Sequence, residues 1–92
     1  MNLPEIKNYS EKAMSNHYDL FALSKGLNVG KPLEKPCSNC FVIHCKSWRQ
    51  YEMYKAILYT AWKANAFDAY LFGSVIPYIR ISDFKKVVYE KA

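Results

Sequence analysis

The fold is decided by the stretch SWRQYEMYKAILYTAWKANAFDAYLF, which runs from Ser47 to Phe72. Ser47 stands three residues before Gln50, the spacing of a capping box, in which a hydroxyl and an amide satisfy the free N–H groups of a first helical turn. At about 100° per residue, the large apolar side chains fall on one stripe. That stripe consists of Trp48, Tyr51, Tyr54, Leu58, Ala61 and Trp62. The sequence therefore predicts a long helix, with a break near Asn65 and an end at Gly73, a residue suited to the left-handed conformation.

This aromatic stripe has two interpretations. Large side chains on one face are what a helix needs in order to pack against a core. Exposed rings are also the platform on which the bases of a nucleic acid stack. The core interpretation is favoured for the stripe itself, and a partner surface is expected after Asn65, where apolar rings exceed what a narrow stripe can bury. The residues of that partner surface are Phe67, Tyr70, Leu71, Phe72 and Tyr78.

Before the long helix, residues 5–24 give a loose i, i+3, i+4 apolar series that predicts a first helix, capped by Asn8 or Ser10. His17 lies near its apolar side and is interpreted as a packed side chain. Residues 25–39 hold two glycines and two prolines and predict a long loop.

Residues 40–46, CFVIHCK, are the clearest strand, a β-branched and aromatic run that ends at the helix cap. Its two faces would carry, in turn, Phe41, Ile43 and Cys45, and Cys40, Val42 and His44. Residues 75–81 predict a second strand, which Pro77 confines to a sheet edge.

After that second strand, Ser82 and Asp83 are predicted to cap a short terminal helix, although residues 85–90 also suit a strand. The predicted fold is therefore α+β, a single domain over residues 1–92 with residues 1–4 disordered. Its order is helix–strand–long helix–strand–short helix, with the helices covering a small two-stranded sheet. If the two strands are parallel, the long helix is a right-handed crossover.

Composition limits the classes of function. The chain has 92 residues, of which 51% are hydrophobic, and 13 basic against 8 acidic residues leave a net charge of +5. No apolar run approaches the ~20 residues that span a bilayer, and the N-terminus lacks the apolar segment of a signal peptide. We therefore expect a cytoplasmic location and no membrane partner. The basic excess is compatible with nucleic acid as a partner and equally with a solvated basic surface.

Cys37 and Cys40 form the most prominent chemical motif, a CxxC with His44 and Cys45 close by. Zinc needs four converging ligands, but adjacent strand residues such as His44 and Cys45 point to opposite faces. Redox CxxC pairs begin a helix, whereas a strand follows this one. Cys37 and Cys40 therefore stay weak metal candidates. No catalytic motif, cofactor site or small-molecule substrate site is identifiable, so we expect no enzyme.

Four blocks resemble the signatures of an uncharacterised family of small bacterial proteins that mobile elements often carry. They are KGLN from Lys25, GKPL from Gly30, PCSNCFV from Pro36 and GSVIP from Gly73. The resemblance covers residues 20–86 and implies no activity.

The segment GSVIPYIRI, from Gly73 to Ile81, also resembles the junction between recognition helix and wing in excisionase-type winged-helix proteins. This resemblance implies that residues 60–72 enter a DNA groove and that Arg80, Lys85 and Lys86 contact phosphates. The stretch before Gly73 departs from the pattern, since it is apolar where a reading helix is basic.

The sequence thus predicts a small basic, non-enzymatic accessory protein that associates with nucleic acid. The residues expected to contact it are Lys31, Lys35, Lys46, Arg49, Arg80, Lys85 and Lys86. The alternative is a protein-interaction module that acts as a homodimer through the aromatic helix or a strand edge.

Overall fold

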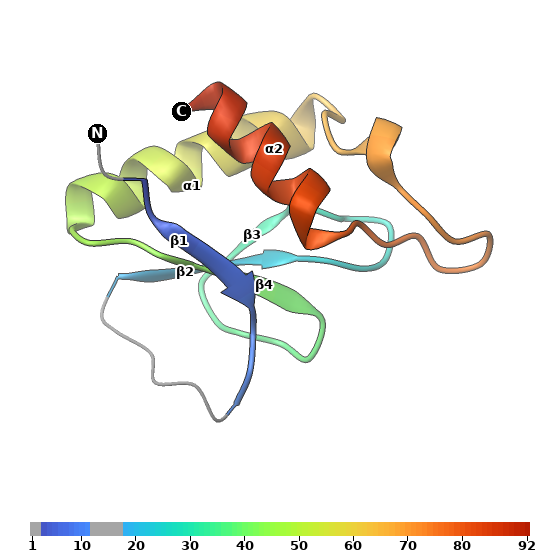
Figure 1. Cartoon of the computed structure of the whole chain (residues 1–92), viewed down its shortest axis with the longest axis horizontal. Coiled ribbons are helices and arrows are strands. Elements are labelled where there is room, and N and C mark those ends of the chain that lie inside the picture. The colour runs from blue at the N-terminus through green and yellow to red at the C-terminus, as the bar shows by residue number, and fades with distance from the viewer. Residues whose placement is uncertain (1–2, 12–17) are drawn as a thin grey trace.

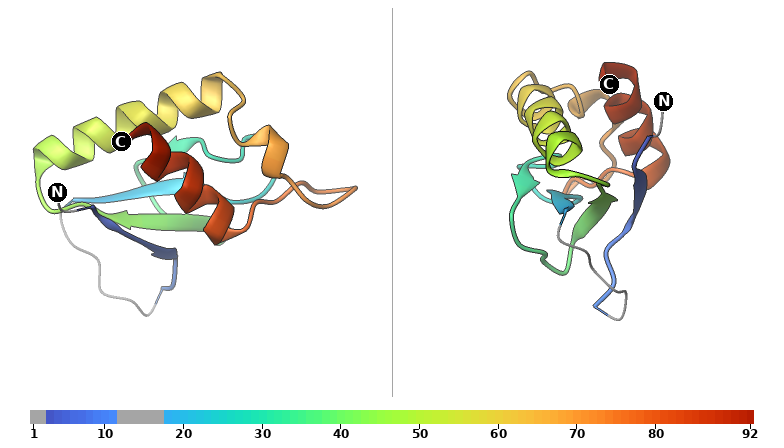
Figure 2. Two further views of the ribbon diagram at one scale, coloured as in Figure 1. Left: turned by 45° about the horizontal axis from the view of Figure 1, so that its top comes forward. Right: turned by 90° about the vertical axis from the view of Figure 1, so that its left-hand side faces the viewer.

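The computed structural model describes residues 3–11 and 18–92. In this part of the chain an antiparallel four-stranded sheet, in the order β1-β4-β2-β3, is covered on one face by two helices (Figures 1 and 2). The strands are β1 (Glu5–Asn8), β2 (Asp19–Leu23), β3 (Pro32–Leu33) and β4 (Cys40–His44). The helices are α1 (Trp48–Lys63), the 3₁₀ turn η1 (Asp68–Tyr70) and α2 (Ile81–Lys91).

The predicted helix over residues 5–24 is wrong, because its described parts form β1 and β2; His17 lies outside the described residues. Residues 19–22 of β2 are all buried, since one side of this central strand faces the helices and the other a smaller cluster. A strand buried on both faces shows no alternation and is easily confused with a helix segment. The predicted two-stranded sheet is accordingly wrong as well, and the long loop over residues 25–39 contains β3.

Residues 75–81 do not form the predicted second strand. Val75 and Ile76 lie exposed in a loop, Tyr78 makes only isolated bridges to Lys25 and Phe72, and Ile81 already begins α2. The element order and the parallel crossover are therefore wrong. The described strand pairs are all antiparallel. Residues 83–90 are helical and form no wing, so the excisionase resemblance of Gly73–Ile81 does not extend to the fold after it.

Two predictions on the sheet and the terminal helix are confirmed. β4 is a strand, although it ends at His44 and not at residue 46 as predicted. Its alternation directs Phe41 and Ile43 into the main core beneath the helices, where Cys45 also lies, and Cys40 and Val42 into a smaller cluster on the other face. The terminal segment is a helix rather than a strand, but the predicted cap is wrong, because Arg80 is the N-cap and Ser82 and Asp83 lie inside the first turn. Its buried side chains are Phe84, Val87 and Val88.

The start of α1 and the break near Asn65 are confirmed, whereas the predicted continuation of the helix to Gly73 is wrong, because only the short turn η1 follows the break. The Ser47 hydroxyl accepts from the Gln50 N–H at 3.1 Å, while the Gln50 side-chain oxygen accepts from the N–H of Lys46, one residue before the cap. The helix ends at Lys63, because Asn65 takes a left-handed conformation with φ 57°. Asparagine tolerates that conformation better than most residues. Gly73, with φ 93°, instead turns the loop before Tyr78.

The main core lies between the sheet and the two helices. The long helix α1 contributes Tyr54, Leu58 and Ala61 to this core. The rings of Phe41 and Phe67 both contact the ring of Phe84 in α2. Near the N-terminus, Pro4 is buried and its carbonyl accepts from the Tyr89 hydroxyl at 2.8 Å. None of the helices in the described residues is both long enough and apolar enough to cross a membrane.

Candidate functional site

Lysine side chains and aromatic rings alternate along one flank of α1. The Lys55 ammonium lies 5.9 Å from the centre of the Tyr51 ring, and the Lys63 ammonium lies 5.8 Å from the Tyr59 ring. The Trp62 ring is contacted twice, by Lys63 at 4.6 Å and by Lys31 at 5.5 Å. We call this surface the α1 flank. It consists of Lys31, Tyr51, Lys55, Tyr59, Trp62 and Lys63.

The spacing of the helix explains why these groups meet. Residues four apart on an α-helix are neighbours on its surface, and Tyr51, Lys55, Tyr59 and Lys63 follow one another at that interval. The core side chains of α1 are displaced from this series toward the sheet. The edge strand β3 packs beside α1, as Figure 2 shows, which brings Lys31 from the preceding residue to Trp62.

The α1 flank lies at the boundary between core and solvent. The Tyr59 side chain is 53% exposed, and Tyr51 and Trp62 are half-buried against the core. A shallow groove of about 260 Å³ runs beside Tyr59 and Lys55 toward Pro32. The core interpretation of the aromatic stripe is therefore confirmed for Tyr54, Leu58 and Ala61, whereas three other members keep accessible surface. Those three are Trp48, Tyr51 and Trp62.

The structure divides the basic residues predicted for nucleic acid among several surfaces. Lys31 belongs to the α1 flank, Lys46 and Arg49 are exposed around the start of α1, and Lys35 is exposed between β3 and β4. Arg80, Lys85 and Lys86 belong to α2 or its N-cap. The Arg80 guanidinium lies 4.3 Å from the centre of the Phe72 ring and its Nε 3.5 Å from an Asp83 oxygen, and Lys86 lies 5.8 Å from the Tyr70 ring.

Sequence reasoning missed three members of the α1 flank, namely Lys55, Tyr59 and Lys63. The signal that identifies them is the alternation of tyrosine and lysine every four residues from Tyr51. Lys55 also approaches Glu34 at 3.7 Å, so part of its charge is balanced.

The residues predicted as a partner surface differ in how far they are exposed. Phe67 is buried and stacks on Phe84, with ring centroids 5.5 Å apart, so it cannot contact a partner directly. Tyr70 and Leu71 are half-buried. Phe72 and Tyr78 are exposed, and their ring centroids lie 5.8 Å apart.

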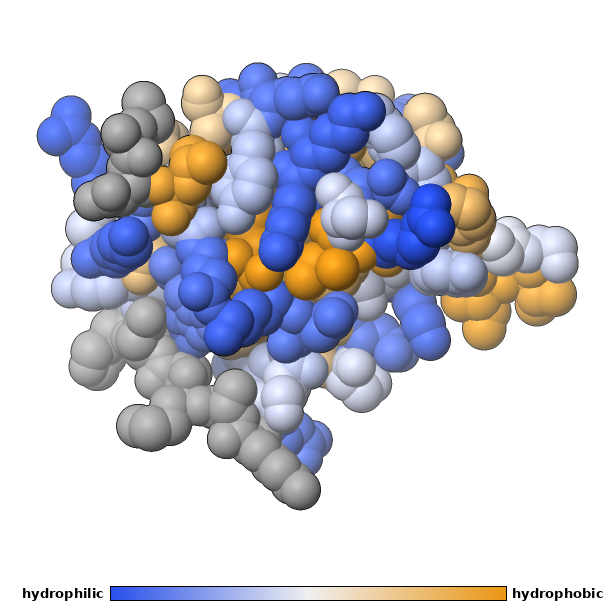
Figure 3. All heavy atoms as spheres, in the orientation of Figure 1, coloured by the Kyte–Doolittle hydropathy of each residue, from blue (hydrophilic) through white to orange (hydrophobic). Residues whose placement is uncertain are grey.

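More exposed than these rings are three aliphatic side chains at one end of the molecule. Leu27 is 93% exposed and Val75 89%, and Ile76 is also exposed. Their two loops lie side by side, because the Gly26 N–H donates to the Pro77 carbonyl at 2.8 Å. Figure 3 shows hydrophobic surface at this projecting end. We call Leu27, Val75 and Ile76 the loop end.

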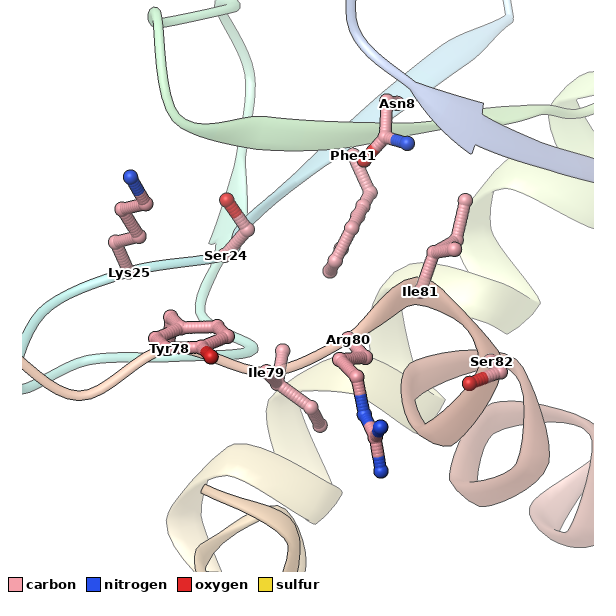
Figure 4. A pocket seen from close by; sticks show the side chains of 9 residues that line it. All are labelled: Asn8, Ser24, Lys25, Phe41, Tyr78, Ile79, Arg80, Ile81 and Ser82. Atoms are coloured by element: carbon pink, nitrogen blue, oxygen red, sulfur yellow. The ribbon is translucent and has the colours of Figure 1, made fainter. Parts of the chain in front are cut away.

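A groove of about 450 Å³ lies between the sheet and the start of α2 (Figure 4). Phe41, Ile79 and Ile81 give it apolar walls, and Asn8 and Ser24 lie at its edge. In Figure 4 the charged end of Arg80 extends away from the space around Phe41, and Lys25 also points outward. The groove thus lacks the converging charges that a site for a small anion needs.

Cys40 and Cys45 are held as thiols. Cys40 Sγ donates to the Cys37 carbonyl at 3.1 Å and accepts from the Cys37 N–H at 3.4 Å. Burial raises the pKa of Cys40 and of Cys45 to about 11, so neither is a thiolate near neutral pH. Across residues 3–11 and 18–92, no three His, Cys, Asp or Glu side chains are grouped so that they could hold a metal ion.

Comparison with known proteins identifies the family of the chain. The model of a family of unknown function, DUF6943, matches residues 6–92. No curated protein and no solved structure matches the chain.

Proposed function

We propose that this chain, which belongs to the DUF6943 family of unknown function, is a small, basic, non-enzymatic protein that associates with nucleic acid. The α1 flank carries this proposal. It presents three lysines beside three aromatic rings, on a chain whose net charge is +5. Phosphates attract the lysines, and rings with accessible surface offer contacts to bases or sugars.

The arrangement favours this function over a merely solvated surface. A solvated lysine extends into water, whereas Lys31, just before β3, and Lys63, at the end of α1, both lie close to the Trp62 ring. Two like charges beside one ring repel each other, and a phosphate that binds near both lowers that repulsion. An anionic partner is therefore stabilised at this point of the surface.

Salt dependence tests the proposal. Binding that neutralises three phosphates should weaken roughly 20-fold to 40-fold between about 50 and 200 mM salt, depending on whether the strand is single or duplex. The measurement is fluorescence anisotropy of labelled generic DNA and RNA, each in single-stranded and duplex form. Absence of binding to all of them at the lowest salt would contradict the proposal.

A matched pair of variants locates the surface. Replacing Lys31, Lys55 and Lys63 by Gln should abolish most of the affinity. Replacing Lys7, Lys25 and Lys91 by Gln gives the same net charge from three other exposed positions and should change the affinity much less. Equal losses in the two variants would show that net charge alone, and not the α1 flank, attracts the nucleic acid.

A second candidate function, self-association, is favoured by the loop end. Burying Leu27, Val75 and Ile76 against a second copy would remove exposed apolar surface from water. Lys25 and Arg80 lie close to these loops, so a symmetric dimer would bring like charges together. Added salt should therefore strengthen self-association in sedimentation velocity, the opposite of its effect on nucleic-acid binding. A Val75→Ser, Ile76→Ser double variant that sediments like the parent at every concentration would argue against this second function.

A further inference from the structure

We infer that the α1 flank binds single-stranded nucleic acid, with bases stacked on Tyr59 and Trp62 and phosphates held by Lys31 and Lys63. This inference rests on the proposed function and adds to it the form of the nucleic acid. It is carried by the placement of rings and ammonium groups on one accessible strip of surface.

The rings distinguish a single strand from a duplex. In a duplex the base faces are stacked on one another, so a protein meets phosphates and the edges of the bases in the grooves. A single strand can turn its base faces toward aromatic side chains. Lysines alone would serve either form, but Tyr59 and Trp62 beside them are useful only to a strand with free base faces.

The position of α1 also disfavours insertion into a duplex groove. One side of α1 is buried against the sheet through Tyr54 and Leu58, and α2 packs beside it. On the outward side of α1, Arg49 and Lys63 stand at the two ends. The middle of this side consists of Glu52, Ala56 and Thr60, which offer one negative charge and no positive charge to a groove. The usable surface is the flank toward β3, which lies beside the helix rather than along its crest.

Two rings with accessible surface, Tyr59 and Trp62, lie at the C-terminal end of the flank. The Tyr59 and Trp62 ring centroids lie 5.9 Å apart with an angle of 65° between the planes, so the edge of one ring meets a face of the other and the rings do not stack on each other. Each can therefore receive its own base. Residues 51–63 span about 18 Å of helix, enough for a strand of a few nucleotides to follow.

In the free protein, lysines occupy these ring faces. An exposed lysine–ring contact is weaker than the stacking of a base on a ring. A base should therefore displace the ammonium of Lys63 or Lys31, and the displaced lysine is then within reach of the phosphate beside that base. The end with Lys31 and Lys63 is the stronger one, because Lys55 is partly balanced by Glu34.

The first experiment compares ligands of equal charge. The probes are a labelled oligothymidine of about 12 nucleotides, a duplex with the same number of phosphates, and inorganic polyphosphate as competitor. We expect at least tenfold tighter binding of the single strand than of the duplex, and weak competition by polyphosphate. Equal binding of single strand and duplex, with strong competition by polyphosphate, would overturn the stacking inference and leave the proposed association with nucleic acid intact. No binding of any probe would refute both.

The second experiment tests the rings. Tyr59→Ala should weaken binding of the single strand about fivefold or more and leave duplex binding unchanged, while Tyr59→Phe, which keeps the ring, should bind like the parent. Met53→Ala is the matched control, since Met53 is 47% exposed on the other side of α1. Trp48→Phe leaves Trp62 as the sole tryptophan of the chain, and stacking should quench its fluorescence on titration with the single strand. An unchanged affinity of Tyr59→Ala, together with unquenched Trp62, would refute stacking even if the strand binds.

Discussion

Trp62 and Lys63 are neighbours in sequence, and the Lys63 ammonium folds back to within 4.6 Å of the centre of the Trp62 ring. Consecutive residues of a helix point about 100° apart, so this contact depends on the long lysine side chain curling around the helix. It also leaves Lys63 close to Tyr59, at 5.8 Å from that ring. The Lys63 ammonium therefore lies close to two aromatic rings of the α1 flank.

Lys63→Gln should therefore weaken nucleic-acid binding more than removal of a peripheral lysine. Losing one phosphate contact should lower the salt slope by about 0.7 to 0.9. The measurement is the slope of log affinity against log salt for Lys63→Gln and for Lys91→Gln, which removes the same charge from the end of α2. Identical slopes for the two variants would show that Lys63 does not contact a phosphate.

Gly30→Ala should destabilise the fold strongly. Gly30 has φ +89°, and an added Cβ would overlap the buried ring of Phe67. A left-handed backbone alone costs an alanine about 1–2 kcal/mol, and the clash in the core should bring the loss of unfolding free energy to roughly 3–5 kcal/mol. Urea denaturation followed by circular dichroism measures it.

Gly26→Ala is the control for the effect of backbone conformation. Gly26 has a similar φ of +95°, but an added Cβ would meet no atom within 4 Å. This variant should lose only the backbone contribution of about 1–2 kcal/mol. Equal losses at the two glycines would mean that the Phe67 ring moves aside at little cost.

Ser47→Ala should weaken the start of α1. Its hydroxyl accepts from the Gln50 N–H at 3.1 Å, and the loss of such a cap costs about 1 kcal/mol of unfolding free energy. Ser38→Ala, in the exposed loop before β4, should change stability by less than about 0.5 kcal/mol. Equal melting temperatures of the two variants would show that the Ser47 cap does not stabilise the fold.

Stability should fall as the pH rises between about 9 and 11. Burial raises the pKa of the Cys45 thiol from 9.0 to about 11, so the protonated form is favoured in the folded chain. The stability contributed by this group is fully present below the unfolded pKa and is lost as pH rises through the folded pKa. The loss should reach roughly 2 kcal/mol for Cys45, with additions from Cys40, Tyr54 and Tyr89, whose pKa values are also raised.

The variant Cys45→Ala separates the contribution of Cys45 from the others. Its unfolding free energy, measured in urea at about pH 8 and at about pH 11, should fall less between the two values than that of the parent. A drop as large as in the parent would assign the alkaline loss of stability to the other groups.

The sequence carried enough information for the elements that are encoded locally. Ser47 and Gln50 mark the start of α1, alternation assigns the two faces of β4, and the spacing of Phe84, Val87 and Val88 identifies α2. Each of these signals lies within a few consecutive residues. For the candidate site, the sequence predicted Lys31 and left the aromatic stripe open to a stacking interpretation, but it did not identify Lys55, Tyr59 or Lys63.

What the sequence by itself determined, then, is one long aromatic helix from Ser47, one strand before it and one short helix at the end. Only the tertiary structure decided that β1, β2 and β3 join β4, because strand pairing connects residues far apart in the chain, such as Asp19 and His44. It also decided which rings of α1 are buried. A helix stripe is wider than the area that a small sheet and α2 cover, so Tyr59 and Trp62 stay at the margin, where lysines from α1 and from the residue before β3 reach them.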